Sequence, residues 1–155
     1  MQNDFFSQTY LSKTKMKGIT LKTVTKNIFF GIFTSARNYS FLNSSVVPAA
    51  RGSVKIKRDS NKNYVIQIHL SNLAEVERVQ PSKQTYVVWM VTDRDMTKNI
   101  GQLNSSVSFF SKRLTGSLNT VSSIKPTKIF ITAENDPSTQ NPDMQVILST
   151  DRFQK

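Results

Sequence analysis

Residues 85–91 (TYVVWMV) limit the possible folds more than any other segment of the chain. Successive side chains of a strand point to opposite faces, so Tyr86, Val88 and Met90 share one face while Trp89 lies on the other between two valines. A strand with two apolar faces must be covered on both sides, as the central strands of layered structures are. We therefore expect this strand in the middle of the fold, with Tyr86 and Trp89 as core anchors.

Shorter segments with alternating polar and apolar residues follow one another along the rest of the chain. Residues 52–59 and 64–70 predict a hairpin, because the turn DSNKN between them is rich in residues that bond to their own backbone. The other predicted strands are residues 99–103, 106–110, 116–123, 128–134 and 144–149. Without a long amphipathic helix, this pattern predicts an all-β, antiparallel β-sandwich of about seven or eight short strands. Its last two strands should supply further core anchors, namely Ile129, Ile131, Val146 and Leu148.

The formal net charge of +11 is concentrated in the first part of the chain. Residues 1–60 hold ten Lys and Arg against two acidic residues, whereas residues 61–155 hold eleven against eight. We expect residues 1–45 to form a poorly structured basic arm and residues 46–155 to form the sandwich. Scattered lysines in an arm are typical of a targeting segment or a solvated tail. Nucleic-acid binding is therefore disfavoured, while contact of the arm with a membrane surface stays open.

The arm has the order of residues found in a secretory signal. Basic residues at 13–26 precede the apolar run IFFGIF at 28–33, and small residues follow it. The run is shorter than the roughly 7–15 apolar residues of such signals, and no segment approaches the about 20 that cross a membrane. Two interpretations remain, a degenerate export signal or a cytoplasmic extension, and we favour export.

The strand residues also resemble a known family. In order, the chain carries YVVWMV at 86–91, Gly101 and Leu103, IFITAE at 129–134 and VIL at 146–148. This series resembles the C-terminal domain of bacterial anti-sigma-K-type factors, which is an extracytoplasmic β-sandwich. The resemblance implies a sandwich fold and a periplasmic or cell-envelope location.

The chain departs from that family in two ways. The family's Gly-rich loop is replaced by DPSTQNP at 136–142. The residues before the first predicted strand show neither the helical sigma-binding domain nor the transmembrane helix through which family members inhibit a sigma factor. The resemblance therefore implies the fold and the location, and does not carry over direct inhibition of a sigma factor.

The sequence shows no catalytic constellation, and we expect a non-enzymatic domain without cofactor or metal. The chain lacks Cys, its only histidine (His69) falls on the polar face of a strand, and no nucleophile-elbow, zinc-protease, dinucleotide or P-loop motif occurs. The best small cluster is Glu134, Asp136 and Asp143 around the turn-rich loop 135–143. We expect these carboxylates to fix the loop by hydrogen bonds, with ligand binding as the alternative.

Two aromatic features have competing interpretations. Trp89 is expected in the core, and the alternative is an exposed platform for a sugar or a peptide. Phe109 and Phe110 cannot both point inward in one strand, so one of them is expected on the surface.

The leading hypothesis is an envelope domain that acts by contact with a protein partner, in signalling of the anti-sigma type. The alternatives are a carbohydrate-binding or adhesive module that uses Asp136 or Asp143, and a cytoplasmic binder of nucleic acid. The first alternative predicts saturable glycan binding, and the second predicts binding that falls steeply with salt.

Overall fold

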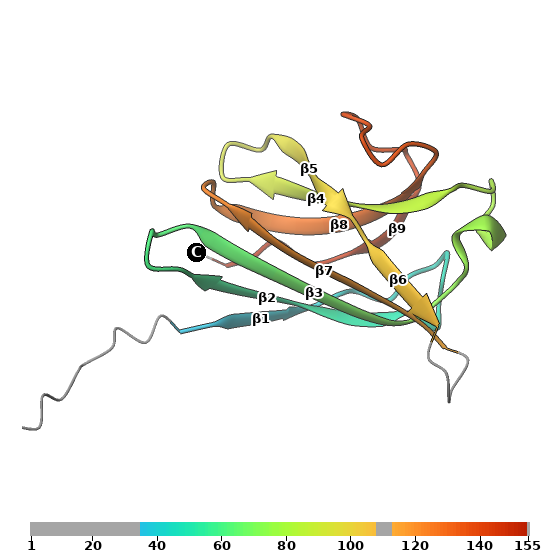
Figure 1. The fold of residues 1–155 in the computed structure, drawn as a ribbon, viewed down its shortest axis with the longest axis horizontal. Coiled ribbons are helices and arrows are strands. Elements are labelled where there is room, and N and C mark those ends of the chain that lie inside the picture. The colour runs from blue at the N-terminus through green and yellow to red at the C-terminus, as the bar shows by residue number, and fades with distance from the viewer. Residues whose placement is uncertain (1–34, 108–112, 155) are drawn as a thin grey trace, which may run out of the picture. The chain divides into compact units, whose positions relative to one another are not determined.

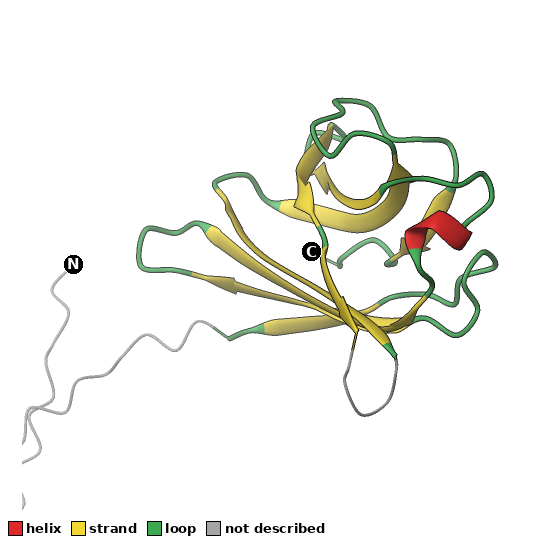
Figure 2. Ribbon diagram, turned by 45° about the vertical axis from the view of Figure 1, so that its right-hand side comes forward, coloured by secondary structure: helices red, strands yellow, loops and turns green. Residues whose placement is uncertain are grey.

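Two antiparallel sheets stack face to face in the computed structural model, which describes residues 35–107 and 113–154 (Figure 1). The five-stranded sheet has the order β1-β2-β3-β7-β6 and the four-stranded sheet has the order β5-β4-β8-β9. The strands are β1 (Arg37–Ser40), β2 (Arg51–Arg58), β3 (Tyr64–Leu73), β4 (Thr85–Thr92), β5 (Thr97–Gln102), β6 (Asn104–Val107), β7 (Leu114–Ser122), β8 (Pro126–Glu134) and β9 (Val146–Ser149). A single 3-10 turn, η1 (Val76–Arg78), is the helical piece of the described residues (Figure 2). The antiparallel β-sandwich predicted from the sequence is confirmed.

The core lies between the sheets and is built from alternate residues of the central strands. On β4, Tyr86, Val88 and Met90 point inward, and their partners on β8 include Ile129 and Ile131. They pack against apolar residues of the other sheet, of which Val54, Ile66 and Ile68 are fully buried. Burial raises the pKa of Tyr86 to about 12, with a smaller contribution from Glu77. The hydroxyl of Tyr86 therefore stays protonated and donates to the Ala74 carbonyl (3.1 Å).

The opposite face of β4 is buried as well, although it lies outside the core between the sheets. Trp89 and Val87 are each 0 % exposed. The side chain of Trp89 stacks on Phe130 of β8, with ring centroids 6.3 Å apart. The β5 neighbour of Trp89 is Asn99, whose side-chain NH2 donates to the carbonyls of Pro137 and Thr139 (2.9 Å each). The loop 135–145 therefore crosses this face and covers Trp89, which excludes the exposed-platform interpretation.

The chain links the two sheets along both lateral sides of the sandwich. On one side the Leu42 N–H donates to the Ser149 carbonyl (2.8 Å) and the Ser44 hydroxyl donates to the Ile147 carbonyl (2.5 Å), so residues 41–47 cover the outer edge of β9. On the other side the chain passes from β5 into β6 of the other sheet at Leu103, which is buried. The cover over β9 discourages its pairing with other chains, whereas the edge strand β6 is exposed.

The structure corrects the predicted start of the folded part. Strand β1 lies within residues 1–45, the range assigned to the arm, and pairs with β2 with Arg37 opposite Ile56. Strand β1 has the sequence RNYS and lies at the edge of its sheet. A short edge strand of this kind buries little, so its sequence shows one apolar side chain and no alternating pattern. Strand β1 brings the number of strands among the described residues to nine. The basic and apolar segments at 13–33 lie outside the described residues, as do Phe109 and Phe110.

One predicted core anchor is wrong. Val146 is 43 % exposed, whereas Tyr86, Trp89, Ile129, Ile131 and Leu148 are all buried. The register between β8 and β9 shifts between Ile131 and Thr132, so Val146 pairs with Thr132 on the outer face while both Ile147 and Leu148 are buried. A one-residue irregularity of this kind reverses the inward and outward assignment of a strand. No helix among the described residues is long and apolar enough to cross a membrane.

Candidate functional site

The predicted acidic cluster serves to hold the loop 135–145 in place. Glu134 ends β8 and is 6 % exposed. Its carboxylate oxygen Oε1 accepts hydrogen bonds from the Thr132 hydroxyl (2.5 Å) and from the backbone N–H of Asp143 (2.7 Å). The Thr132 hydroxyl oxygen accepts the indole N–H of Trp89 (2.8 Å). A continuous chain of hydrogen bonds thus joins Trp89 to the far end of the loop.

Asp136 and Asp143 each bond to neighbours of their own. The Asp136 carboxylate accepts from the hydroxyl (2.7 Å) and the N–H (2.8 Å) of Ser138, and these bonds lower the pKa of Asp136. The pKa of Asp143 is lowered chiefly by its hydrogen bond from Lys83 Nζ (2.6 Å), and the N–H of Gln145 also donates to it. Since the three carboxylates point to different partners, they do not converge on one ligand position.

The other sequence-predicted candidates lie apart from this loop. His69 is exposed on β3, on the outer face of the five-stranded sheet, opposite Ser53 and Ser117. Within residues 35–107 and 113–154, no group of three His, Asp or Glu side chains is placed to hold a metal ion.

A feature that sequence reasoning missed lies at the end of the sandwich where three turns meet. The β2–β3 turn is held by Asp59, whose Oδ1 accepts the N–H groups of Asn61 (2.9 Å) and Asn63 (2.8 Å). The β4–β5 turn is held by the buried Thr92 hydroxyl, which accepts the N–H of Met96 (3.1 Å). The β7–β8 turn and the C-terminal residues 151–154 lie at the same end (Figure 1). These short, bonded turns give the end a defined shape.

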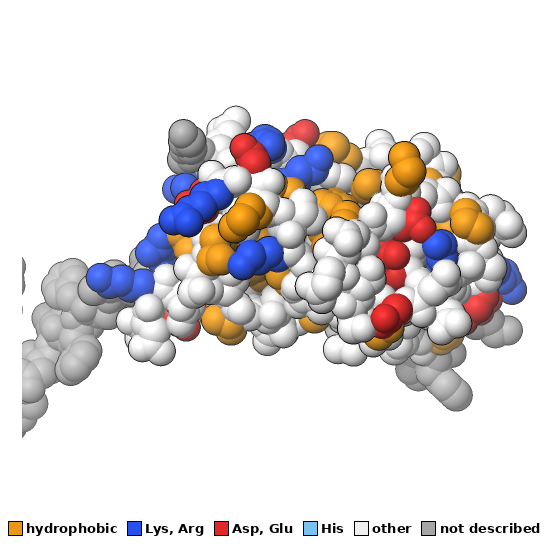
Figure 3. Space-filling view, turned by 90° about the horizontal axis from the view of Figure 1, so that it is seen from above, with side chains coloured by type: hydrophobic (Ala, Val, Ile, Leu, Met, Phe, Trp, Pro, Cys, Tyr) orange, Lys and Arg blue, Asp and Glu red, His pale blue; other side chains and the backbone are white. Residues whose placement is uncertain are grey.

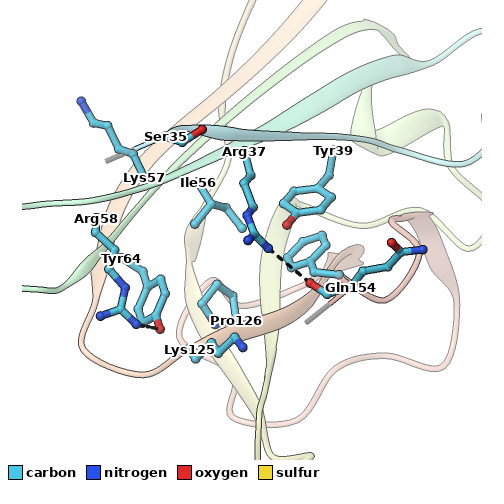
Figure 4. Close-up of a pocket in the computed structure, with 11 residues that line it drawn as sticks. Ser35, Arg37, Tyr39, Ile56, Lys57, Arg58, Tyr64, Lys125, Pro126 and Gln154 are labelled. Atoms are coloured by element: carbon cyan, nitrogen blue, oxygen red, sulfur yellow. Dashed lines mark hydrogen bonds between the residues drawn. The ribbon is translucent and has the colours of Figure 1, made fainter. Parts of the chain in front are cut away.

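Two adjacent hollows open at this end, and together we call them the basic groove. The first has a volume of about 450 Å³ and is lined by Ser35, Arg37, Tyr39, Ile56, Lys57, Arg58, Tyr64, Lys125, Pro126, Phe153 and Gln154 (Figure 4). The second has a volume of about 380 Å³ and is lined by Arg58, Lys62, Tyr64, Asp93, Arg94, Met96, Ser123, Ile124 and Lys125. Arg58, Tyr64 and Lys125 line both, so the two hollows lie side by side.

Positive charge dominates the first hollow. Its lining includes Arg37, Lys57, Arg58 and Lys125, and no carboxylate of residues 35–107 or 113–154. Arg37 points into the hollow, where its guanidinium donates to the Gln154 carbonyl (3.4 Å), while Lys57 points away from it (Figure 4). The second hollow adds three more charged groups of its own, of which one is acidic, Asp93. Because the described lining holds several cations close together and one acidic side chain, the groove is suited to attract negatively charged groups.

Aromatic side chains form much of the wall. Tyr39 of β1 and Phe153 near the C-terminus stack with ring centroids 4.0 Å apart. The backbone N–H of Phe153 donates to the Thr127 carbonyl (2.7 Å), which fixes the tail against β8. The Arg58 guanidinium lies 4.5 Å from the centre of the Tyr64 ring and donates to its hydroxyl. Tyr64 thus holds Arg58 in place beside the hollow, and Tyr39 holds the tail.

The charge distribution over the surface agrees with this location. Lys and Arg side chains gather toward the left of the space-filling view, over the end of the sandwich with the groove, where a few acidic side chains lie among them, and a row of acidic side chains lies toward the opposite end (Figure 3).

Comparisons of the chain with protein-family models, with curated proteins and with solved structures gave no match. The resemblance to the anti-sigma-K-type domain therefore remains a prediction.

Proposed function

We propose that this domain is a non-catalytic binding module that acts by contact with a protein partner, and that the basic groove receives an acidic segment of that partner. The observation that carries the proposal is the lining of the first hollow, where Arg37, Arg58 and Lys125 meet aromatic side chains and where the described residues include no carboxylate. Loops at one end of a β-sandwich are a common place for binding sites, because a rigid scaffold holds them. The size of the first hollow favours a short segment of a partner over a broad protein surface.

The aromatic side chains favour a peptide over a single-stranded nucleic acid. Binding of single strands relies on open aromatic faces on which bases stack. Here Tyr39 and Phe153 stack on each other, and one face of Tyr64 is covered by Arg58. The loop carboxylates Asp136 and Asp143, on which a glycan site was expected to depend, are engaged by Ser138 and Lys83. Carboxylates of a peptide can reach the cations without needing a free ring face.

Charge reversal in the groove tests the proposal. The double variant Arg37→Glu, Lys125→Glu should bind a capped, Glu-rich peptide at least about tenfold more weakly than the unchanged protein, because two attractive charges become repulsive. Isothermal titration at low salt measures the change, and binding by the unchanged protein should weaken as salt is added.

The matched control carries the same charge change elsewhere. Lys55 on β2 and Lys98 on β5 are exposed and do not line the groove. The variant Lys55→Glu, Lys98→Glu should bind the peptide within about threefold of the unchanged protein. Equal losses of peptide affinity in both double variants would show that the effect comes from net charge, and would refute the groove as the binding site. Tighter binding of a short oligonucleotide than of the peptide would favour the nucleic-acid alternative.

We extend the proposal to a periplasmic or envelope location. It is supported by the resemblance of residues 86–148 to an extracytoplasmic domain and by the basic-then-apolar order of residues 13–33. A reporter that is active only after export, fused behind Lys155, should be active in bacterial cells. A reporter that stays inactive while the fusion protein accumulates in the cytoplasm would contradict this location.

A further inference from the structure

The geometry of the first hollow points to a more specific ligand, which we propose is an acidic segment that carries a large apolar side chain between its carboxylates. This inference rests on the proposed function and adds the identity of the central residue. A purely acidic segment would pair with the cations of the groove but would leave the apolar surface of the groove exposed to water.

The inner part of the hollow is apolar. Ile56 is 9 % exposed and Pro126 is buried, and both line the hollow together with the stacked pair Tyr39 and Phe153. Figure 4 shows Ile56, Tyr39 and Pro126 around the same hollow as the side chains of Arg37 and Lys125. An apolar side chain placed there removes its own surface and that of the wall from water, at about 25 cal/mol per Å².

The charged groups stand around this apolar wall. Arg37 comes from β1, Arg58 from the end of β2 and Lys125 from the β7–β8 turn, so they approach the hollow from three elements. Carboxylates on either side of an apolar anchor can therefore pair with different cations at the same time. Arg37 points into the hollow, and a guanidinium attracts the face of an aromatic ring, which favours Phe, Tyr or Trp as the anchor.

The size of the site agrees with a side chain flanked by further residues. A volume of about 450 Å³ is within the roughly 300–1,000 Å³ of small-ligand sites and far exceeds what one carboxylate needs. The second hollow continues past Arg58, Tyr64 and Lys125, which gives an extended segment a path over the turns. Interfaces of this kind depend on a few anchors in pockets, surrounded by polar contacts.

Two capped peptides of equal charge separate this inference from the proposed function. Isothermal titration of the full chain compares Glu-Glu-Phe-Glu-Glu with Glu-Glu-Gly-Glu-Glu. We expect the Phe peptide to bind at least about tenfold more tightly, because only it buries an anchor. In Phe153→Ala the preference should fall to about threefold or less, whereas Phe153→Leu, which keeps an apolar wall, should retain most of it. Thermal unfolding of both variants checks that they remain folded.

Each outcome decides a different point. Equal binding of the two peptides, lost in Arg37→Glu, Lys125→Glu, would overturn the apolar anchor and leave the proposed function standing. Failure of both peptides to bind would overturn both proposals. Retention of the full preference for Phe in Phe153→Ala would place the anchor elsewhere and contradict the inferred position. A preference for Phe that persists when Glu is replaced by Lys would show that charge plays no part.

Discussion

Replacing Trp89 by alanine should lower the free energy of unfolding by about 3–5 kcal/mol, the cost typical of truncating a large buried aromatic side chain. Trp89 is 0 % exposed and stacks on Phe130. It also joins the central strand β4 to the covering loop 135–145 through the Thr132 hydroxyl. Because domains of this size are stable by only about 5–15 kcal/mol, the variant is expected to unfold well below the temperature of the unchanged protein.

The control for this prediction is Trp89→Phe. Phenylalanine keeps most of the apolar volume and loses the indole N–H that donates to Thr132 (2.8 Å). We expect it to cost about 1–3 kcal/mol, clearly less than alanine. Urea denaturation followed by circular dichroism measures both variants. A loss under about 1 kcal/mol for Trp89→Ala would mean that the loop does not cover this face in solution.

Replacing Glu134 by leucine should destabilise the domain by about 2–4 kcal/mol even though leucine is apolar and the site is buried. Its carboxylate accepts hydrogen bonds from the Asp143 N–H and the Thr132 hydroxyl, and leucine leaves these two groups without an acceptor. A buried polar group that loses its partner costs about 1–3 kcal/mol. The damage should be concentrated in the loop, so hydrogen exchange of the Asp143 amide should accelerate more than that of the β3 amides.

Glutamine at the same position separates hydrogen bonding from packing. Glu134→Gln keeps an oxygen acceptor of nearly the same shape, so we expect it to lose about 1 kcal/mol or less and to retain slow exchange at Asp143. Urea denaturation and amide exchange by NMR are measured on both variants under the same conditions. Equal losses for leucine and glutamine would show that the hydrogen bonds contribute little and that charge is the decisive property of Glu134.

The sequence was informative about the fold where burial leaves a regular pattern. The alternation in β2 and β3 and the two apolar faces of β4 predict these strands because each has at least one buried face. Strand β1 escapes such reasoning, since its inward residues are Arg37 and Tyr39 at an edge. Val146 was misplaced because the register shift beside Thr132 is a property of strand pairing, which alternation within one strand does not reveal.

The basic groove could not be predicted from the sequence for a different reason. Its cations are spread from Arg37 to Lys125, and only the topology brings them to one end of the sandwich. Arg37 and Tyr39 are two residues apart on one strand and so share a face. This spacing was the one local sign in the sequence of a site that combines a cation with an aromatic ring. The acidic residues around the loop, in contrast, are close in sequence and were found, and the structure gives them bonds that hold the loop.

Mapping amide chemical shifts by NMR during titration with the peptide Glu-Glu-Phe-Glu-Glu shows where an acidic segment binds. We expect the largest shifts to cluster at the basic groove, in residues such as Arg37, Tyr39, Tyr64, Lys125 and Gln154. The loop 135–145 should change little, because its polar groups are engaged in its own hydrogen bonds. The largest shifts in that loop, or around His69 on the outer face of the five-stranded sheet, would contradict the groove as the binding site.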